Sequence, residues 1–266
     1  MTLNLNRRTM LKAGAAATAF AAAKPAFADD HAPKRGGTLR LGLKGANTSD
    51  SFDGRTHTDN FMITMAHGCV FDCMTEIAAD GSLKGELAES WEASSDAKTW
   101  TFNLRKGVEF HNGKKFGAED VLETFALHVG EDSKSPAKPI IGAIEEMKKM
   151  NDHQIQFVLK NGNADFPFLL SDYHILIHPA GMIEESIAKG IGTGAYKLDT
   201  FEPGVRALAT HNDNDYRDDR GWFDAVEALG INDTAARMNA MMTGQVDAIA
   251  EIDKKTKMML DRNPNV

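Results

Sequence analysis

The sequence predicts an α/β fold, and three observations lead to this prediction. Within residues 99–104, apolar and polar residues alternate as in a strand with one buried face. Within 118–127, apolar residues recur at helical spacing and acids occupy the first turn, where the helix dipole favours them. Further on, a strand (223–231), a helix (234–243) and a strand (246–249) have the spacing of a crossover unit with parallel strands.

The remaining elements follow from the same two periodicities. We expect strands at 38–43, 154–160, 173–178 and 205–210, and helices at 61–70, 143–150 and 166–170. Residues 44–60 are rich in Gly, Ser, Thr, Asp and Asn and predict a long loop, with Asp59 or Asn60 able to cap the next helix. A long loop directly after a core strand is often functional.

Composition limits the partners of the chain. Its 266 residues are enough for one large domain or two ordinary ones, and 42% hydrophobic with 26% charged residues is ordinary for a globular protein. The formal net charge is −8, whereas nucleic acids and anionic membranes attract basic surfaces. We therefore expect no nucleic-acid partner.

The first 28 residues predict an export signal. Consecutive arginines, Arg7 and Arg8, precede an alanine-rich run that ends in Ala-Phe-Ala at residues 26–28, the pattern of a cleavage site. The run is too short and too weakly apolar to span a bilayer. Arg-Arg-x-x-Leu-Lys resembles the twin-arginine signal. We expect cleavage after Ala28 and a mature chain in the periplasm, without a lipid anchor because no cysteine follows the run.

The chemistry-bearing residues do not form a catalytic or metal-binding motif. Cys69 and Cys73 are the only cysteines, so a cysteine-based zinc site lacks ligands, and buried thiols or a disulfide across one turn both remain open. Five histidines, His57, His67, His111, His174 and His178, are scattered without a metal-binding spacing. No G-x-S-x-G elbow occurs, and the paired glutamates at 145–146 and 184–185 are adjacent, so their side chains diverge on the helices expected there. We expect no enzyme activity, no metal and no cofactor.

Two stretches carry a family resemblance. Residues 86–121, ELAESWEASSDAKTWTFNLRKGVEFHNGKKFGAEDV, closely resemble the signature block of the family-5 extracellular solute-binding proteins, the peptide- and nickel-binding components of ABC importers. Residues 191–198, IGTGAYKL, are similar to the family's G-T-G-P-Y-x-L, with Ala195 in place of the usual proline.

The resemblance implies a periplasmic binding protein type II-like fold. Residues 29–50 and 185–266 would build the core of the first lobe, and 51–184 an inserted subdomain. Because members of the family are longer, we expect this chain to be an N-terminal fragment from which the second lobe is absent.

The resemblance also implies a function. The protein is expected to be a monomer that captures a small solute, most often a short peptide, and delivers it to the permease subunits of an ABC transporter. A nickel chelate, an opine, a sugar or haem on the same scaffold remains an alternative. A periplasmic metallohydrolase that uses the histidines is the alternative from another class.

Seven residues are candidates for ligand contact. They lie in the loop after the first strand and beside the return to the first lobe: Asp53, Thr58, Asp59, Asn60, Phe61, Tyr173 and His174. Carboxylate and amide groups suit an amine or a peptide N–H, and aromatic rings suit an apolar wall. For each of them the competing interpretation is an ordinary loop, cap or core position.

Overall fold

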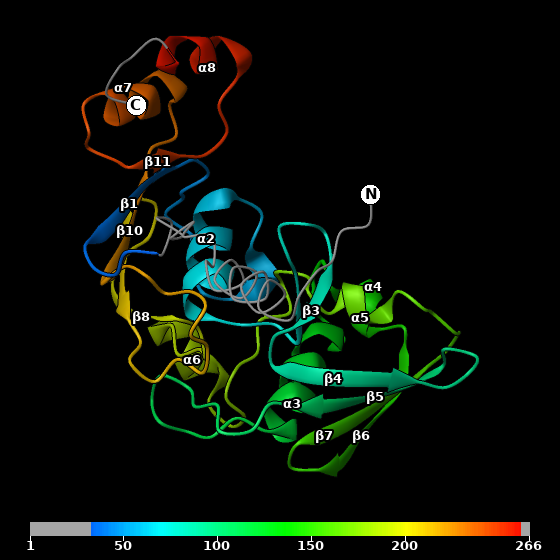
Figure 1. Cartoon of the computed structure of the whole chain (residues 1–266). Coiled ribbons are helices and arrows are strands. Elements are labelled where there is room, and N and C mark those ends of the chain that lie inside the picture. Colours follow the sequence, from blue (N-terminus) through cyan, green and yellow to red (C-terminus); the bar gives the residue numbers. More distant parts are fainter. Residues whose placement is uncertain (1–32, 262–266) are drawn as a thin grey trace, which may run out of the picture. The chain divides into compact units, whose positions relative to one another are not determined.

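The computed structural model describes residues 33–261 (Figure 1). Residues from Arg35 onward belong to one unit, and the elements below all lie within it. The predicted export signal and the cleavage after Ala28 lie outside the described residues.

A mixed five-stranded sheet has the order β11-β1-β10-β9-β8 (Figure 1). β1 pairs in parallel with both β10 and β11, whereas β9 and β8 continue the sheet antiparallel. Helix α7 connects β10 to β11, which confirms the predicted crossover unit. The bounds are β1 (Thr38–Leu43), β8 (Tyr196–Glu202), β9 (Arg206–His211), β10 (Ala225–Gly230), α7 (Thr234–Met242) and β11 (Ala248–Ile249).

A second, antiparallel sheet has the order β4-β5-β7-β6. Its buried face is built by alternation, since every second residue of β5 and β7 is buried. The ring of Phe125 on α3 stacks on Phe157 of β7, with 5.3 Å between ring centroids. The bounds are β4 (Ala88–Ala93), β5 (Thr99–Leu104), α3 (Ala118–Val129), β6 (Ile144–Asn151) and β7 (Gln154–Leu159).

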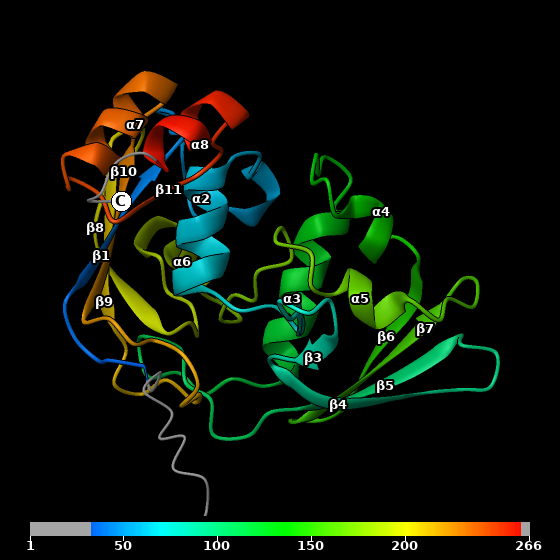
Figure 2. The same ribbon diagram turned by 45° about the horizontal axis from the view of Figure 1, so that its top comes forward.

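The shorter elements complete the unit. β2 and β3 form a two-stranded pair. Helix α2 packs against β10, and the π-turn η2 that follows it packs against β8 (Figure 2). The bounds are η1 (Gly54–Thr56), α2 (Asn60–Met65), η2 (Ala66–Val70), β2 (Thr75–Ile77), β3 (Leu83–Gly85), α4 (Lys138–Ile141), α5 (Phe166–Leu169), α6 (Ile183–Lys189) and α8 (Lys254–Leu260).

The prediction of a helix at 143–150 was wrong, because these residues form the edge strand β6. Glu, Met and Lys are good helix formers, but their local preference is weak and pairing with β7 overrides it. Most of the strand is exposed, and charged side chains along an edge strand discourage further pairing. The paired glutamates at 145–146 therefore lie on a strand and not on a helix.

The prediction of a strand at 173–178 was also wrong. The segment is buried from His174 onward, as predicted, but its backbone pairs with no neighbouring strand. Its amide groups bond individually instead: Ile177 donates to the carbonyl of Asp72, and His178 donates to Thr124 Oγ1. Because buried amide groups need partners, this irregular segment satisfies them one by one where a strand would use a ladder.

Two clusters of buried apolar residues form the core. One lies around the antiparallel sheet and includes Phe102, Phe125 and Phe157. The other lies around the five-stranded sheet, where Phe52 and Phe61 pack in the same cluster as Leu43 and Val226. The proposed division into 29–50, 51–184 and 185–266 stays a prediction.

The turn at 192–194 packs directly against the backbone of η2. A Cβ on Gly192 would lie 2.0 Å from the carbonyl oxygen of Val70, and one on Gly194 would lie 2.3 Å from that of Cys69. No side chain fits at these separations, so the glycines allow two backbones to touch. The turn therefore joins the start of β8 to the segment that follows α2.

Candidate functional site

The carboxyl ends of three parallel strands meet at one edge of the five-stranded sheet. The loop 44–60 follows β1, Ile231 and Asn232 follow β10, and Ala250 and Glu251 follow β11. In open α/β sheets, ligands bind outside the carboxyl ends of the strands. This edge is therefore the candidate ligand site.

Side-chain hydrogen bonds hold the loops at this edge together. Asn232 accepts from the backbone N–H of Gly45 at 2.8 Å and donates to the carbonyl of Ala46 at 3.0 Å. Asn60 Nδ2 donates to Glu251 Oε1 at 3.0 Å. Gly45 has a φ of +93°, and a Cβ there would lie 2.2 Å from the Cβ of Asp59. The close approach fixes the loop where it leaves β1.

A polar hollow of about 180 Å³ opens within this loop. Two carboxylates, Asp50 and Asp59, face it, and no basic side chain is among its lining residues. Burial and the charge of Asp59 raise the pKa of Asp50 above its ordinary value. The hollow is therefore acidic and suits a cationic group such as an ammonium. Its lining is Gly45, Asn47, Ser49, Asp50, Ser51, Thr56, Thr58, Asp59 and Met62.

Three of the predicted ligand residues lie at this edge. Thr58 is exposed and lines the hollow beside Asp59. Asp59 also caps α2, because Oδ1 accepts from the N–H groups of Phe61 and Met62 at 2.9 and 3.2 Å. Asn60 belongs to the same edge through its bond to Glu251. Their contact with a ligand stays a prediction.

The other four predicted residues have structural partners. Phe61 is fully buried in the core. Asp53 caps η1 and forms an ion pair with Arg55 at 2.8 Å. His174 is buried, and its ring bonds Asp172 Oδ1 at 2.6 Å and the carbonyl of His57 at 3.0 Å, while the half-buried Tyr173 packs on that ring. The hydrogen bond from His174 ties the predicted pair to the loop before α2.

Two further histidines are buried among neutral partners. His178 bonds Ser186 Oγ at 2.7 Å, and His128 bonds Ser135 Oγ at 2.6 Å. Burial lowers the pKa of His178 to about 3 and that of His128 to about 4. Both imidazoles are therefore neutral in the folded protein near pH 7.

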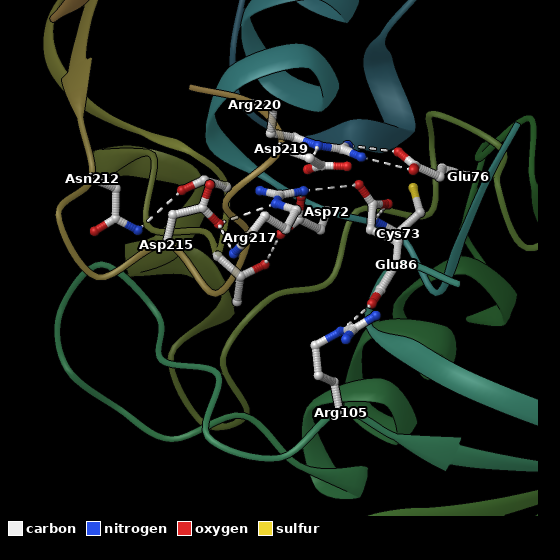
Figure 3. A network of polar contacts seen from close by, with 12 residues as sticks. Asp72, Cys73, Glu76, Glu86, Arg105, Asn212, Asp215, Arg217, Asp219 and Arg220 are labelled. Carbon is white, nitrogen blue, oxygen red and sulfur yellow. Dashed lines mark hydrogen bonds and ion pairs between the residues drawn. The ribbon is translucent and has the colours of Figure 1, made fainter. Parts of the chain in front are cut away.

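A buried network of charges that the sequence did not predict is centred on Arg217 (Figure 3). The Arg217 side chain is 11% exposed and contacts Asp72 at 2.7 Å, Asp215 at 3.0 Å and Glu86 at 3.4 Å. The three carboxylates are 2–5% exposed. Asp72 Oδ2 also accepts from the hydroxyl of Thr193, in the glycine turn. The network therefore joins the segment after η2, the residues just before β4 and the segment after β9.

The charges in the network are unequal. Burial and the charge of Asp72 raise the pKa of Glu86 well above its ordinary range, although Arg217 opposes the shift. Burial alone would lower the pKa of the Arg217 guanidinium. The charges of Asp72, Asp215 and Glu86 outweigh burial and raise that pKa. One cation thus faces three carboxyl groups.

A second arginine extends the network toward solvent. Arg220 forms two bonds with Glu76, at 2.7 and 2.9 Å, and contacts Asp219 at 3.1 Å. Two hollows, of about 240 and 220 Å³, lie beside these residues. Both are lined by Glu76, Glu86, Arg217 and Arg220. His67 also lines the hollow of about 220 Å³, and with Cys73 and Glu86 it forms a group of possible metal ligands.

No local signal in the sequence predicts this network. Arg217 is 145 residues from Asp72 and 131 from Glu86. The only hint is that each of the three lies beside an aromatic or apolar residue, in Phe71-Asp72, Glu86-Leu87 and Tyr216-Arg217. A buried ion pair of this kind depends on the tertiary fold.

Comparison with known proteins identifies the scaffold. The family model described as "Bacterial extracellular solute-binding proteins, family 5 Middle" matches residues 82–266. The chain belongs to this family. The match includes the whole of the stretch 86–121, which builds β4, β5 and the start of α3, so that stretch indicates the scaffold and not the ligand.

Relatives in the family bind different solutes. The chain is 29% identical over 201 residues to the "Nickel-binding periplasmic protein" of Escherichia coli K12, covering 73% of this chain and 37% of that one. It is 33% identical over 148 residues to the "Dipeptide-binding protein" of the same organism, covering 45% of this chain and 27% of the relative. The chain thus spans less than half the length of these relatives.

The fold is that of type II periplasmic binding proteins. It matches the solved structure of the "ABC transporter-associated periplasmic binding protein DppA from Helicobacter pylori in complex with peptide STSA" with a TM-score of 0.78 at 23% identity. The match covers 87% of this chain and 50% of that one. Among the described residues, no helix has both the length and the apolar character needed to cross a membrane.

Replacing Arg217 by methionine should destabilise the fold by about 3–5 kcal/mol, because it leaves three buried carboxyl groups without their cation. Urea unfolding followed by circular dichroism measures the difference. Arg206→Met is the matched control, since the Arg206–Glu227 pair has a 37% exposed arginine and such pairs contribute about 0–1 kcal/mol. Equal losses in both variants would contradict the central role of Arg217.

Stability should fall as the pH drops from 7 to 5. In the unfolded chain His128 and His178 titrate near about 6.5, whereas their folded pKa values are about 4 and about 3. Below pH 6.5 the unfolded state therefore binds protons that the folded state excludes, which costs on the order of 1 to 2 kcal/mol per histidine at pH 5. When the free energy of unfolding is measured by urea titration at several pH values, His128→Asn should reduce its dependence on pH. If the variant loses as much stability between pH 7 and pH 5 as the native protein does, His128 is not buried and neutral.

Proposed function

We propose that the protein is the substrate-binding component of an ABC importer that captures short peptides or a similar small amine-bearing solute. The observation that supports this most directly is the acidic hollow at the carboxyl edge of β1, β10 and β11, in a chain of the family-5 solute-binding proteins. Asp50 and Asp59 there would receive the terminal ammonium of the peptide, and Met62 would contact its first side chain.

The proposed mechanism is binding and release without chemical change. The ligand enters the edge formed by the loop 44–60 and the ends of β10 and β11, and ligand binding shifts an equilibrium between open and closed forms. The permease subunits in the inner membrane recognise the closed form and take up the ligand. His174, with the Tyr173 ring packed against it, would support the loop through its bond to the carbonyl of His57, and Asp53 would support it through its ion pair with Arg55.

The setting of this function is the periplasm. We propose that the first 28 residues direct export by the twin-arginine route, that cleavage follows Ala28, and that the mature protein acts as a monomer without nucleic-acid partners. A nickel chelate is the second candidate ligand, because a relative that matches 73% of this chain is named for nickel binding.

Asp59→Asn should weaken peptide binding by about 10- to 100-fold, because the ammonium loses a charged acceptor. Asparagine caps a helix as well as aspartate does, so α2 keeps its cap. Isothermal titration calorimetry with di- and tripeptides and with their N-acetylated forms measures the effect. Acetylated peptides should bind the native protein as weakly as free peptides bind the variant.

The matched control is Asp233→Asn, because Asp233 caps α7 through the N–H of Ala236. This variant should bind peptides as the native protein does. Native mass spectrometry of protein purified without refolding should detect a co-purified peptide that EDTA does not remove. Turnover of the peptide, or loss of all binding in EDTA, would contradict the proposal, and a bound nickel complex would favour the second candidate.

A further inference from the structure

Three side chains of different chemistry converge beside the Arg217 network. A ring nitrogen of His67, the Sγ of Cys73 and a carboxylate oxygen of Glu86 all lie within 4.8 Å of one another. They come from the π-turn η2, from the segment before β2 and from the residue pair before β4. π-turns are rare and often occur at functional sites.

We propose that His67, Cys73 and Glu86 bind one Zn²⁺ ion, with a water or a donor atom of a small ligand in the fourth position. Imidazole, thiolate and carboxylate are the three ligand types of protein zinc sites, and three protein ligands with one open position are a known arrangement. Ca²⁺ and Mg²⁺ are disfavoured because they prefer oxygen ligands throughout. This site is separate from the acidic hollow and does not depend on the proposed function.

The geometry needs only small side-chain movements. Zinc–ligand bonds of about 2.0–2.3 Å in a tetrahedral arrangement place the donor atoms about 3.4–3.6 Å apart. The present limit of 4.8 Å between the three donors is about 1 Å wider. Among the described residues the His67 ring has no hydrogen-bond partner, so it can turn toward the other two without losing a bond.

The protein already holds the other two ligands in place. The backbone N–H of Cys73 donates to Glu86 Oε2 at 2.7 Å, which fixes the carboxylate against the cysteine. The Cys73 thiol makes only a weak 3.4 Å contact with the carbonyl of Asp172. Arg217 is 2.7 Å from Asp72 but 3.4 Å from Glu86 Oε1, so this oxygen is the more weakly engaged of the two partners.

The hollow supplies both access and the open position. His67 and Glu86 line the hollow of about 220 Å³, while Cys73 is fully buried behind them. An ion entering from the hollow therefore meets the imidazole and the carboxylate first. Its fourth position would face back into the same space.

A divalent cation also reduces an excess of buried negative charge. Asp72, Glu86 and Asp215 face the single cation of Arg217, which leaves two negative charges in excess when all three carboxyl groups are ionised. Zinc binding releases the thiol proton of Cys73 and adds two positive charges, so the excess falls to one.

The test is a titration of the tag-free chain with Co²⁺ as a spectroscopic substitute, followed by displacement with Zn²⁺. One equivalent of Co²⁺ should produce a near-ultraviolet thiolate-to-cobalt charge-transfer band, which Zn²⁺ removes. Cys73→Ser should abolish the band, and both Cys73→Ser and His67→Gln should weaken Zn²⁺ binding by more than the roughly 100-fold effect of losing an outer-shell partner.

Cys69→Ser is the matched control, because Cys69 is also a buried free thiol but is outside the group of three. It should leave the band and the stoichiometry unchanged. Circular dichroism of each variant establishes that it is folded. Absence of the band in the native chain, its persistence in Cys73→Ser, or its equal loss in Cys69→Ser would overturn the proposal, whatever the outcome of the peptide titrations.

Discussion

The buried guanidinium of Arg217 is the interaction on which the arrangement of the chain depends. It reaches carboxylates from three separate stretches, at Asp72, Glu86 and Asp215. Removing one partner of a buried ion pair is costly, so the carboxyl groups of these three stretches depend on the arginine that lies among them. Thr193 adds a hydrogen bond to Asp72 from the glycine turn. The network thus fixes the segment after η2, from which the loop before α2 is positioned.

This constraint connects the scaffold to the ligand edge. Gly192 and Gly194 pack on the backbone of Cys69 and Val70, which holds the end of the α2–η2 segment. The beginning of that segment is the cap Asp59, which faces the acidic hollow. Because both ends are held, the carboxylate of Asp59 is presented at a defined place, as a preorganised binding group requires. The family resemblance in 86–121 indicates this framework and does not indicate which ligand binds.

Local periodicity predicted much of the fold. The alternation in 99–104 predicted β5 and the helical spacing in 118–127 predicted α3. A cap at Asp59 or Asn60 was predicted before an apolar run, and in the structure Asp59 is the cap. The errors arose where neighbours override local preference: β6 is a strand of helix-forming residues because β7 pairs with it. The Arg217 network could not be predicted, because its members lie up to 145 residues apart and only the tertiary fold brings them together.

The most direct test of the account is hydrogen–deuterium exchange of the native protein with and without a saturating dipeptide. If the ligand binds at the carboxyl edge of β1, β10 and β11, protection should increase in 45–62, 231–232 and 250–251, while the antiparallel sheet at 88–159 stays unchanged. Protection confined to the antiparallel sheet, or recovery of the dipeptide as a chemically altered product, would contradict the account.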